Sequence, residues 1–458
     1  ADRAGNALYS DVSVVPHVTN EKATTCGGLL GLVTFTALGL PTLDGARSEC
    51  AWGTDDDAPV PGIFGPQHLP HLERDDYVTN GNDSYWLTNP EQPLEGFARI
   101  IGDERAERSL RTRLGLDMVQ QRLAGTDGRD PAAGNVVTQD ILQELVFENR
   151  NLAGELTVNA MVELCRSLGA TAPSTTGTPV TIEGACDVLD GWNRHDDLDA
   201  PGAVLFRRFW THLSSSLLPI DALGLALSQL PEELRRILPI STVLPDGVPW
   251  KVPFSLADPV HTPRDLDTAN PRVALALGDA INDLRGAGIP LDAGLRGWQY
   301  EVKDGEKIPV HGGPGTFGVF NAISARWNPN PGDRAGYSDI DHGSSFVMAA
   351  HFVDPATNDG CGIDADAIVT YSQSEDVTRP HHADQSRLFA EKQWNPMYFC
   401  DDEINADPGL QVLRLVSKGT ATGPLLPATG SSSTAPMALA LVAVLAVLAP
   451  RAWRTVRR

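Results

Sequence analysis

An asparagine-rich turn is the segment of this sequence whose residue types best fit catalytic chemistry. It runs from Asn80 to Pro90 and reads NGNDSYWLTNP. Asparagine tolerates left-handed turns, and its side-chain amide can donate a hydrogen bond to an oxyanion that develops during acyl transfer. The same residues can form an ordinary Asx turn, and Asn82-Asp83-Ser84 also matches the glycosylation sequon. Spacing alone favours the ordinary turn.

Other motifs with chemical potential are weaker. Residues 313–318 satisfy the spacing G-x-G-x-x-G, but the enclosed proline and the lack of a long helix after it favour a tight connection between strands. The cluster His381, His382 and Asp384 lacks a third spaced ligand, so a solvated loop is favoured over a metal site. The acidic run 196–199 is interpreted as the first turn of a helix and not as a calcium site. We therefore predict no metal site from these motifs.

Composition and charge exclude some classes of function. The chain has 458 residues, of which 41% are hydrophobic, and a net charge of -23. This much apolar material can form a large core, which excludes general disorder. So acidic a surface repels phosphate backbones, and no basic stripe with interleaved aromatic residues is present. We expect no nucleic acid among the partners.

The cysteines fall into three local pairs, and none has the C-x-x-C spacing of zinc or thioredoxin-type sites. An even number in separated pairs is typical of disulfides formed in an oxidising compartment. Buried free thiols are the alternative that a cytosolic enzyme would favour. The C-terminal sequence favours disulfides, and the expected pairs are Cys26–Cys50, Cys165–Cys186 and Cys361–Cys400.

The C-terminal sequence combines a short motif, an apolar run and a basic end. Residues 419–435 form a spacer that contains the motif LPATG, at Leu426, Pro427, Ala428, Thr429 and Gly430. Residues 436–458 hold an uncharged run that is short for a membrane span, followed by arginines that would act as a positive stop.

This order resembles the LPxTG sorting signal of Gram-positive surface proteins. In that family a sortase cuts between the threonine and the glycine and links the chain to cell-wall peptidoglycan. A plain C-terminal anchor is the alternative. The resemblance implies an exported, wall-anchored protein with a sortase as partner and a membrane-spanning tail before sorting.

Hydrophobic periodicity divides the rest of the chain into three regions. Residues 1–98 are predicted to be part of a core sheet, with strand-like runs in NALYSDVSVVP, GLVTFTALGLP and SYWLTNP. In residues 99–250 the hydrophobic residues recur at helical spacing. Prolines at first-turn positions predict one helix that begins at Pro231 and another that begins at Pro271, beyond this region. Residues 251–418 return to a strand pattern, with candidate strands in HGGPGTFGVFNAI, SSFVMAAHFV and DAIVTYSQS. The order predicts one interrupted α+β core.

Several segments, in order along residues 1–416, resemble the β-chain of the penicillin acylase and acyl-homoserine lactone acylase family of N-terminal nucleophile hydrolases. They include GNALYSDVSVVP, NGNDSYWLTNP, ERAERSLRTRLG, GGPGTFGVFNAI, YSQSEDVTRPHHADQ and QWNPMYF, together with the first two cysteine pairs. The quorum-signal acylase branch is closer than the penicillin G branch. The resemblance implies an αββα sandwich built from two chains, with the helical residues as an insertion beside the cleft.

The resemblance also implies a mechanism. In the family an N-terminal serine attacks the amide carbonyl, its own α-amine acts as the base, and water hydrolyses the acyl-enzyme. The family's oxyanion-binding asparagine maps onto Asn82. The arginine that organises the site maps onto Arg105, with Arg108 as the alternative register. The chemistry needs no metal or organic cofactor, although some relatives hold a structural calcium whose ligands cannot be placed here.

This sequence departs from the family pattern at its first residue. Residue 1 is Ala, and the likeness begins inside the β-chain. A chain without a hydroxyl or thiol at its N-terminus cannot run this mechanism. We therefore expect an inactive C-terminal fragment of a secreted acylase, whose partners are its own α-chain, the missing N-terminal part of the β-chain and a small N-acyl amide substrate. The alternative is a catalytically dead acylase-like protein used for surface binding or display.

Overall fold

The computed structural model describes residues 1–129, 136–214, 247–356 and 360–413. The chain divides into two units after Glu403, and only residues 404–413 of the second unit are described. The predicted helix at Pro231, the LPATG motif and the apolar, basic tail lie outside the described residues. None of the described helices combines the length and apolar character that a membrane span requires.

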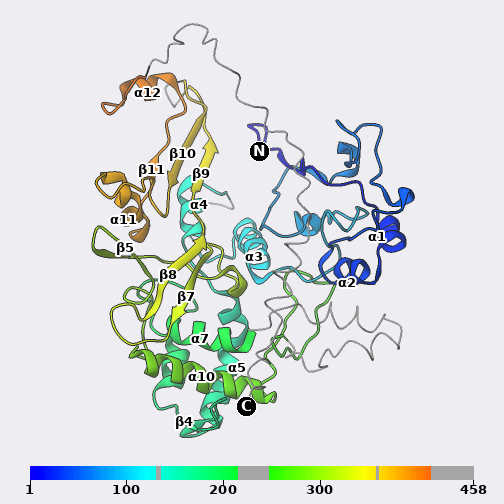
Figure 1. The fold of residues 1–458 in the computed structure, drawn as a ribbon. Coiled ribbons are helices and arrows are strands. Elements are labelled where there is room, and N and C mark those ends of the chain that lie inside the picture. The colour runs from blue at the N-terminus through cyan, green and yellow to red at the C-terminus, as the bar shows by residue number, and fades with distance from the viewer. Residues whose placement is uncertain (130–135, 215–246, 357–359, 414–458) are drawn as a thin grey trace, which may run out of the picture. The chain divides into compact units, whose positions relative to one another are not determined.

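The N-terminal residues, blue in Figure 1, form a strand pair and two helices. β1 (Ala7–Ser10) pairs antiparallel with β2 (His71–Arg74). Between them in the sequence lie α1 (Asn20–Cys26) and α2 (Leu29–Leu38). Three 3-10 turns complete this part, and they are η1 (Ser48–Cys50), η2 (Pro66–His68) and η3 (Tyr85–Leu87). The strand pair therefore brings together the two ends of a long, mostly irregular segment, residues 11–70.

Two of the strands predicted in this part are wrong. The run GLVTFTALGL forms α2, which ends where the left-handed Gly39 donates its N–H to the carbonyl oxygens of Phe35 and Thr34. The glycine cap and the burial of Phe35 beside Val18 and Ala23 outweigh the strand propensity of the β-branched and aromatic residues in this run. The run SYWLTNP forms the turn η3.

Helices dominate the middle of the chain, as the periodicity predicted. They are α3 (Leu110–Ala124), α4 (Gln139–Val146), α5 (Leu152–Ser167), α6 (Ala185–Gly191), α7 (Ala203–Ser214) and α10 (Pro271–Ala287). Side-chain caps fix several starts; Ser109 accepts from the Thr112 amide at the start of α3, and Asn270 accepts from the Arg272 amide at the start of α10. The predicted helix start at Pro271 is confirmed.

The largest hydrophobic core lies among α5, α6, α7 and α10. Figure 1 shows α5, α7 and α10 grouped together, and α7 and α10 pack along their length. The aromatic rings of Trp192, Phe206 and Trp210 are almost fully buried there. Phe206 stacks on Trp192 with ring centroids 4.5 Å apart. This core anchors α7, whose Trp210 also borders the cavity described below.

The strands form small antiparallel sheets. β3 (Thr171–Ala172) pairs with β4 (Val180–Thr181), β5 (Tyr300–Lys303) with β6 (Glu306–Pro309), and β7 (Ile323–Asn328) with β8 (Gly336–Gly343). The three-stranded sheet has the order β11 (Asn395–Pro396), β10 (Ile363–Ile368), β9 (Val347–Phe352). The short helical elements η6 (Pro380–His382) and α11 (Asp384–Ala390) lie between β10 and β11, and α12 (Asp401–Ala406) follows β11.

The strand prediction for the C-terminal half is confirmed at β9 and in part at β10. It is wrong for most of HGGPGTFGVFNAI, where the 3-10 turn η5 (Gly315–Phe317) precedes a strand that begins only at Ile323. The mixed α+β class is confirmed. An αββα sandwich is not evident in the described residues, whose sheets contain two or three strands each.

All three predicted disulfides are present. Cys26 bonds to Cys50, Cys165 to Cys186, and Cys361 to Cys400, and these account for every cysteine in the sequence. The first links the last residue of α1 to η1 and closes the segment that contains α2, and the second joins α5 to α6. The cysteine pattern was therefore a correct predictor of local cross-links.

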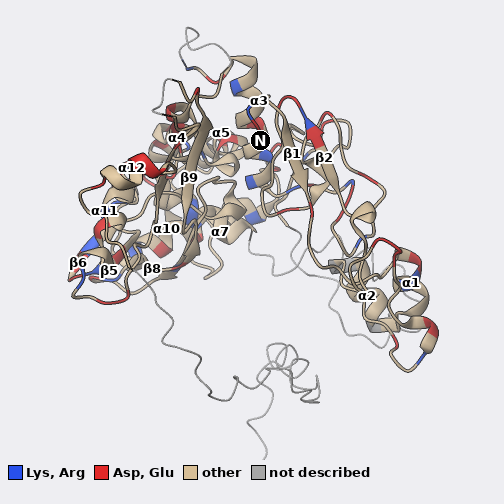
Figure 2. Cartoon of the chain, turned by 90° about the horizontal axis from the view of Figure 1, so that it is seen from above, with Lys and Arg blue, Asp and Glu red and all other residues tan. Residues whose placement is uncertain are grey.

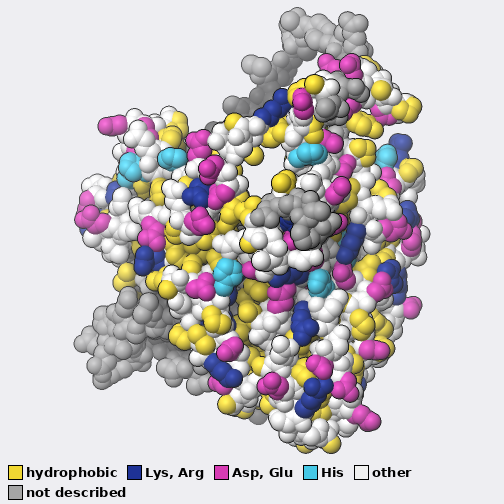
Figure 3. Space-filling view, turned by 180° about the vertical axis from the view of Figure 1, so that it is seen from behind, with side chains coloured by type: hydrophobic (Ala, Val, Ile, Leu, Met, Phe, Trp, Pro, Cys, Tyr) yellow, Lys and Arg dark blue, Asp and Glu magenta, His cyan; other side chains and the backbone are white. Residues whose placement is uncertain are grey.

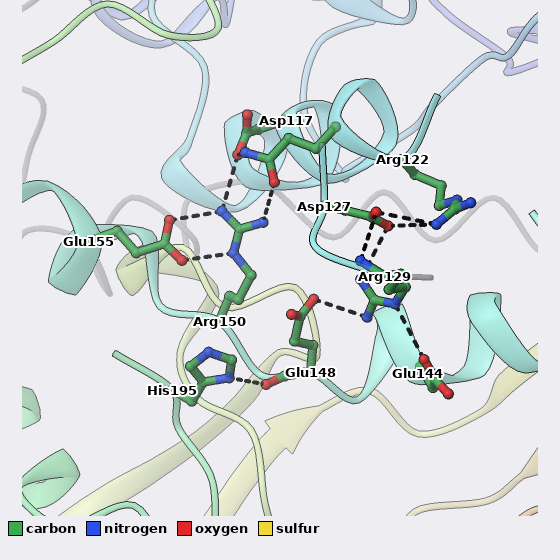
Figure 4. A network of polar contacts seen from close by, with 10 residues as sticks. Asp117, Arg122, Asp127, Arg129, Glu144, Glu148, Arg150, Glu155 and His195 are labelled. Atoms are coloured by element: carbon green, nitrogen blue, oxygen red, sulfur yellow. Dashed lines mark hydrogen bonds and ion pairs between the residues drawn. The ribbon is translucent and has the colours of Figure 1, made fainter. Parts of the chain in front are cut away.

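Charged side chains of both signs are interspersed over the described elements (Figure 2), and the face in Figure 3 shows the same mixture. Some of these charges tie elements together, as Figure 4 shows. Arg150, just before α5, donates from Nε to Glu155 (2.8 Å) and from Nη2 to Asp117 of α3 (3.1 Å). Arg129 donates from Nε to Glu144 of α4 (3.3 Å). The network holds α3, whose first turn contacts the asparagine-rich turn through Arg111.

Candidate functional site

A cavity of about 1260 Å³ lies beside the asparagine-rich turn. The turn contributes Asn82, Asp83 and Ser84 to its wall, and the segment before α3 contributes Arg108. Other wall residues come from α7 and the chain after it, and they include Trp210 and Trp250. A cavity with a polar turn at one side and large aromatic side chains at another can accommodate a molecule that has both a polar group and an apolar chain.

Asn82 adopts a left-handed backbone conformation, with φ of 57°. Its N–H donates to Oδ1 of Asn80 at 2.9 Å, which closes the Asx turn that the spacing favoured. The Asn82 side chain is exposed at the surface of the turn. Asn82 therefore forms the ordinary Asx turn and also has an exposed side-chain amide, so the two interpretations of this residue do not exclude each other.

Asp83 ties this turn to the start of α3. Its Oδ1 accepts from Arg108 Nη1 at 2.9 Å, and its Oδ2 accepts from the Ser109 amide at 2.9 Å and from Thr112 Oγ1 at 3.0 Å. Burial opposes ionisation of this carboxyl, but the Ser109 amide and the Arg108 guanidinium together hold its pKa below the ordinary value. Asp83 is thus a charged anchor that sets the position of Asn82.

Arg111, in the first turn of α3, contacts the Asn82 side chain directly. Its Nη1 donates to Asn82 Oδ1 at 3.0 Å and to the Gly81 carbonyl at 2.8 Å. Its Nε donates to the Phe320 carbonyl at 3.2 Å, which holds the guanidinium in place. A guanidinium has only donors, so this contact fixes Oδ1 and turns Nδ2 away from Arg111. No described residue accepts a hydrogen bond from that Nδ2.

The two arginines predicted from the sequence lie in different environments. Arg105 is exposed, with 60% of its side chain accessible, and pairs with Glu95 at 3.2 Å without lining the cavity. The side chain of Arg108 is only 4% exposed and pairs with Asp83. Its guanidinium lies over the Trp86 ring, 5.7 Å from the centroid. The structure therefore brings Arg108 to the turn and leaves Arg105 outside it.

Sequence reasoning missed Arg111. The segment ERAERSLRTRLG offers arginines at 105, 108, 111 and 113, and nothing in the residue types separates them. Ser109 caps α3, so Arg111 is the second residue of the helix, in its first turn. Recognising that cap would have placed Arg111 next to the turn that Asp83 anchors.

The side chains of the other candidate motifs are paired with neighbouring residues of the chain. The acidic run 196–199 was predicted to be the first turn of a helix, but α7 begins only at Ala203. Asp196 is instead fully buried and lies 3.7 Å from the buried guanidinium of Arg207. His381 bonds to Asp384 at 2.7 Å on the turn η6, which agrees with the predicted loop.

Comparison with known proteins places this chain in a family. Residues 1–406 match the family model "Penicillin amidase". The chain belongs to the penicillin amidase family. This membership confirms the resemblance inferred from the ordered motifs, since the match covers nearly all of the region that carries them.

Two curated proteins are similar to this chain over most of its length. The aculeacin-A acylase of Actinoplanes utahensis is 41% identical over 424 residues, which cover 92% of this chain and 47% of that protein. An acyl-homoserine lactone acylase, PvdQ of Pseudomonas fluorescens (strain Pf0-1), is 30% identical over 417 residues, which cover 90% and 45%. The chain thus spans about half the length of the curated relatives it matches.

A solved structure of a thermostable penicillin G acylase from Alcaligenes faecalis also matches. The alignment covers 91% of this chain and 67% of that chain, with 14% sequence identity and a TM-score of 0.41. The assignment to the penicillin amidase family rests on the sequence match and not on this likeness.

Proposed function

We propose that this chain is the C-terminal part of a secreted amidohydrolase that cleaves the acyl amide bond of N-acyl compounds. The nucleophile in this proposal is an N-terminal serine on a segment outside the chain. Family membership supports the hydrolysis of an amide bond as the reaction. The match to about half of each relative supports the proposal that this chain is one part of a longer enzyme. The names of the relatives suggest acyl-homoserine lactones and aculeacin A as substrates.

The observation that carries the proposal is the orientation of the Asn82 amide. Arg111 holds Oδ1, so the N–H groups of Nδ2 remain available beside a large cavity. In acyl transfer a negative charge develops on the former carbonyl oxygen, and a donor fixed in advance stabilises that charge without reorganisation. We assign the oxyanion contact to Asn82, the orientation of its amide to Arg111, and the placement of the turn to Asp83 and Arg108.

The proposal also covers the rest of the fold and the location of the protein. The small sheets of the described residues would be completed into an αββα sandwich by the α-chain and the earlier part of the β-chain. The motif LPATG would direct the mature protein to the wall of a Gram-positive cell through a sortase. The disulfides support an oxidising location.

The test is to express the complete gene product and to measure its processed N-termini and its hydrolysis of N-acyl substrates. We expect a second chain that starts with serine, and release of the free amine. Replacement Asn82→Ala should then lower kcat by about 10²–10³-fold, which is the usual cost of one oxyanion donor. An unprocessed and inactive product would instead favour the display alternative. Unchanged turnover in Asn82→Ala would remove Asn82 from the reaction.

A further inference from the structure

A second cluster of functional side chains lies in the irregular loop between Cys50 and β2, within the blue part of the chain in Figure 1. It contains Asp55, Asp57 and His68, and their potential ligand atoms all lie within 4.8 Å of one another. None of these three residues lines the large cavity described above. The cluster is therefore separate from the candidate acylase site.

Asp55 is the centre of the cluster, and its side chain is only 10% exposed. Its Oδ2 lies 2.8 Å from His68 Nδ1 and accepts from the Gly65 amide at 2.9 Å. Its Oδ1 lies 2.9 Å from Nε2 of His17, a residue from a distant segment. Both oxygens of this carboxylate are thus held by fixed partners, and two of these partners are imidazole nitrogens.

Asp57 supplies an oxygen that has no protein donor. Its Oδ2 accepts from the Gln67 amide at 2.9 Å, whereas no described residue donates to its Oδ1. A Cβ atom added at Gly65 would lie 1.9 Å from that Oδ1, so the carboxylate occupies space that only a glycine leaves open. The Gln67 amide and the space at Gly65 thus hold the Asp57 carboxylate, which has one oxygen without a protein donor, near Asp55 and His68.

His17 contacts the Asp55 carboxylate and can hold it in place for binding an ion. Its Nδ1 is buried without a hydrogen-bond partner and packs on Gly53, where an added Cβ would lie 2.2 Å from that nitrogen. A ring nitrogen in this position is better left unprotonated, because a buried N–H without an acceptor is costly. The proton of neutral His17 then resides on Nε2 and is donated to Asp55. A carboxylate that binds a metal is commonly held by such a donor.

We propose that Asp55 Oδ2, Asp57 Oδ1 and His68 Nδ1 form a binding site for a divalent transition ion of the zinc type. Two carboxylate oxygens and one imidazole nitrogen are ligands that zinc accepts, whereas calcium and magnesium favour sets made of oxygen alone. Neutral His68 carries its proton on Nδ1 while it donates to Asp55, and binding requires the tautomer with the proton on Nε2, so that Nδ1 is free to bind the ion. Solvent supplies the remaining coordination. The His68 side chain is 60% exposed, so an ion can reach the site from solvent.

The ion would have a structural role. Apart from the 3-10 turn η2 and an isolated bridge between Ile63 and Pro16, residues 51–70 contain no helix or strand, and neither of these two elements joins the ends of the loop to each other. A metal bound by residues 55, 57 and 68 would join those ends. Because the site forms only in the folded loop, the binding free energy would stabilise that loop.

Calorimetric titration with zinc chloride tests the proposal on the full polypeptide, purified without a histidine tag and freed of metal by chelation. We expect a stoichiometric site that excess calcium does not displace. Asp57→Asn and His68→Gln should each weaken zinc binding by at least about 10-fold. Histidine side chains are exposed at several places on the face in Figure 3, so His71→Gln in β2, also an exposed histidine, is the matched control and should bind as the wild type does.

Hydrogen exchange measured on the wild-type chain tests the zinc site without relying on the variants, which could bind zinc weakly only because they fold poorly. Zinc should slow amide exchange in residues 53–68 and leave the rate in α10 unchanged. The proposal is overturned if the wild type shows no stoichiometric site, if calcium displaces zinc, or if the Asp57 and His68 variants bind zinc as tightly as the His71 variant. Absence of added protection in residues 53–68 would equally reject it. None of these results depends on acylase activity.

Discussion

Replacing Arg111 tests whether the orientation of the Asn82 amide matters. The two orientations of a side-chain amide have nearly the same shape, and only one turns Nδ2 away from Arg111. The contact that selects this orientation is a charge-assisted hydrogen bond of 3.0 Å. Such bonds contribute about 1.5–3 kcal/mol, and the exposure of Asn82 places this one near the lower end. Without that bond the exposed side chain can sample the flipped amide and also the other χ1 rotamers, so the productive orientation becomes one of several. Arg111→Ala in the complete enzyme should therefore lower kcat by up to about 10-fold, since 1.4 kcal/mol corresponds to that factor.

The assay is steady-state hydrolysis of an N-acyl substrate, with kcat and KM measured separately. An interaction that acts only in the transition state lowers kcat with little change in KM. Arg105→Ala is the matched control, because its exposed pair with Glu95 contributes little, and we expect a change below about fivefold.

A double variant separates orientation from general damage to the fold. In the Asn82→Ala background there is no amide left to orient, so adding Arg111→Ala should cost almost nothing further in kcat. An equal loss in both backgrounds would refute the reasoning, because Arg111 would then act independently of Asn82. So would a loss in Arg105→Ala that matches the loss in Arg111→Ala.

Three further predictions concern stability and location. Burial lowers the pKa of His311 to about 3, so the folded state takes up a proton at lower pH than the unfolded state. The free energy of unfolding should therefore fall as the pH drops from about 6.5 toward 3. Urea titrations should show a weaker pH dependence in the variant His311→Gln. Replacing Cys165 and Cys186 together by alanine should lower the free energy of unfolding by about 3 kcal/mol, and a loss below about 1 kcal/mol would contradict a stabilising cross-link. Thr429→Ala should release the protein from the wall fraction, whereas unaltered retention would reject the sorting signal.

The sequence predicted local features of this protein better than those that depend on packing. Paired cysteines, the Asx turn and the helix that begins at Pro271 follow from short-range chemistry, and all are present. The run that forms α2 was assigned wrongly because its β-branched and aromatic residues favour a strand, while its Gly39 cap and the burial of Phe35 decide for a helix. The role of Asp196 was also out of reach, because its partner Arg207 is brought near only by the fold.

The choice among the arginines shows how a local motif and its surroundings combine. A turn as exposed as that of Asn82 would not hold an amide in one direction by itself. Asp83 supplies the rigidity by bonding to the start of α3, and α3 is fixed in turn by Arg113, whose buried guanidinium donates to the carbonyl oxygens of Val260 and Thr262 at 2.8 and 3.0 Å. Any displacement of α3 therefore moves the Asp83 anchor and the Arg111 contact together. It follows that changes along the buried side of α3, far from the cavity, should lower kcat through the direction of a single amide.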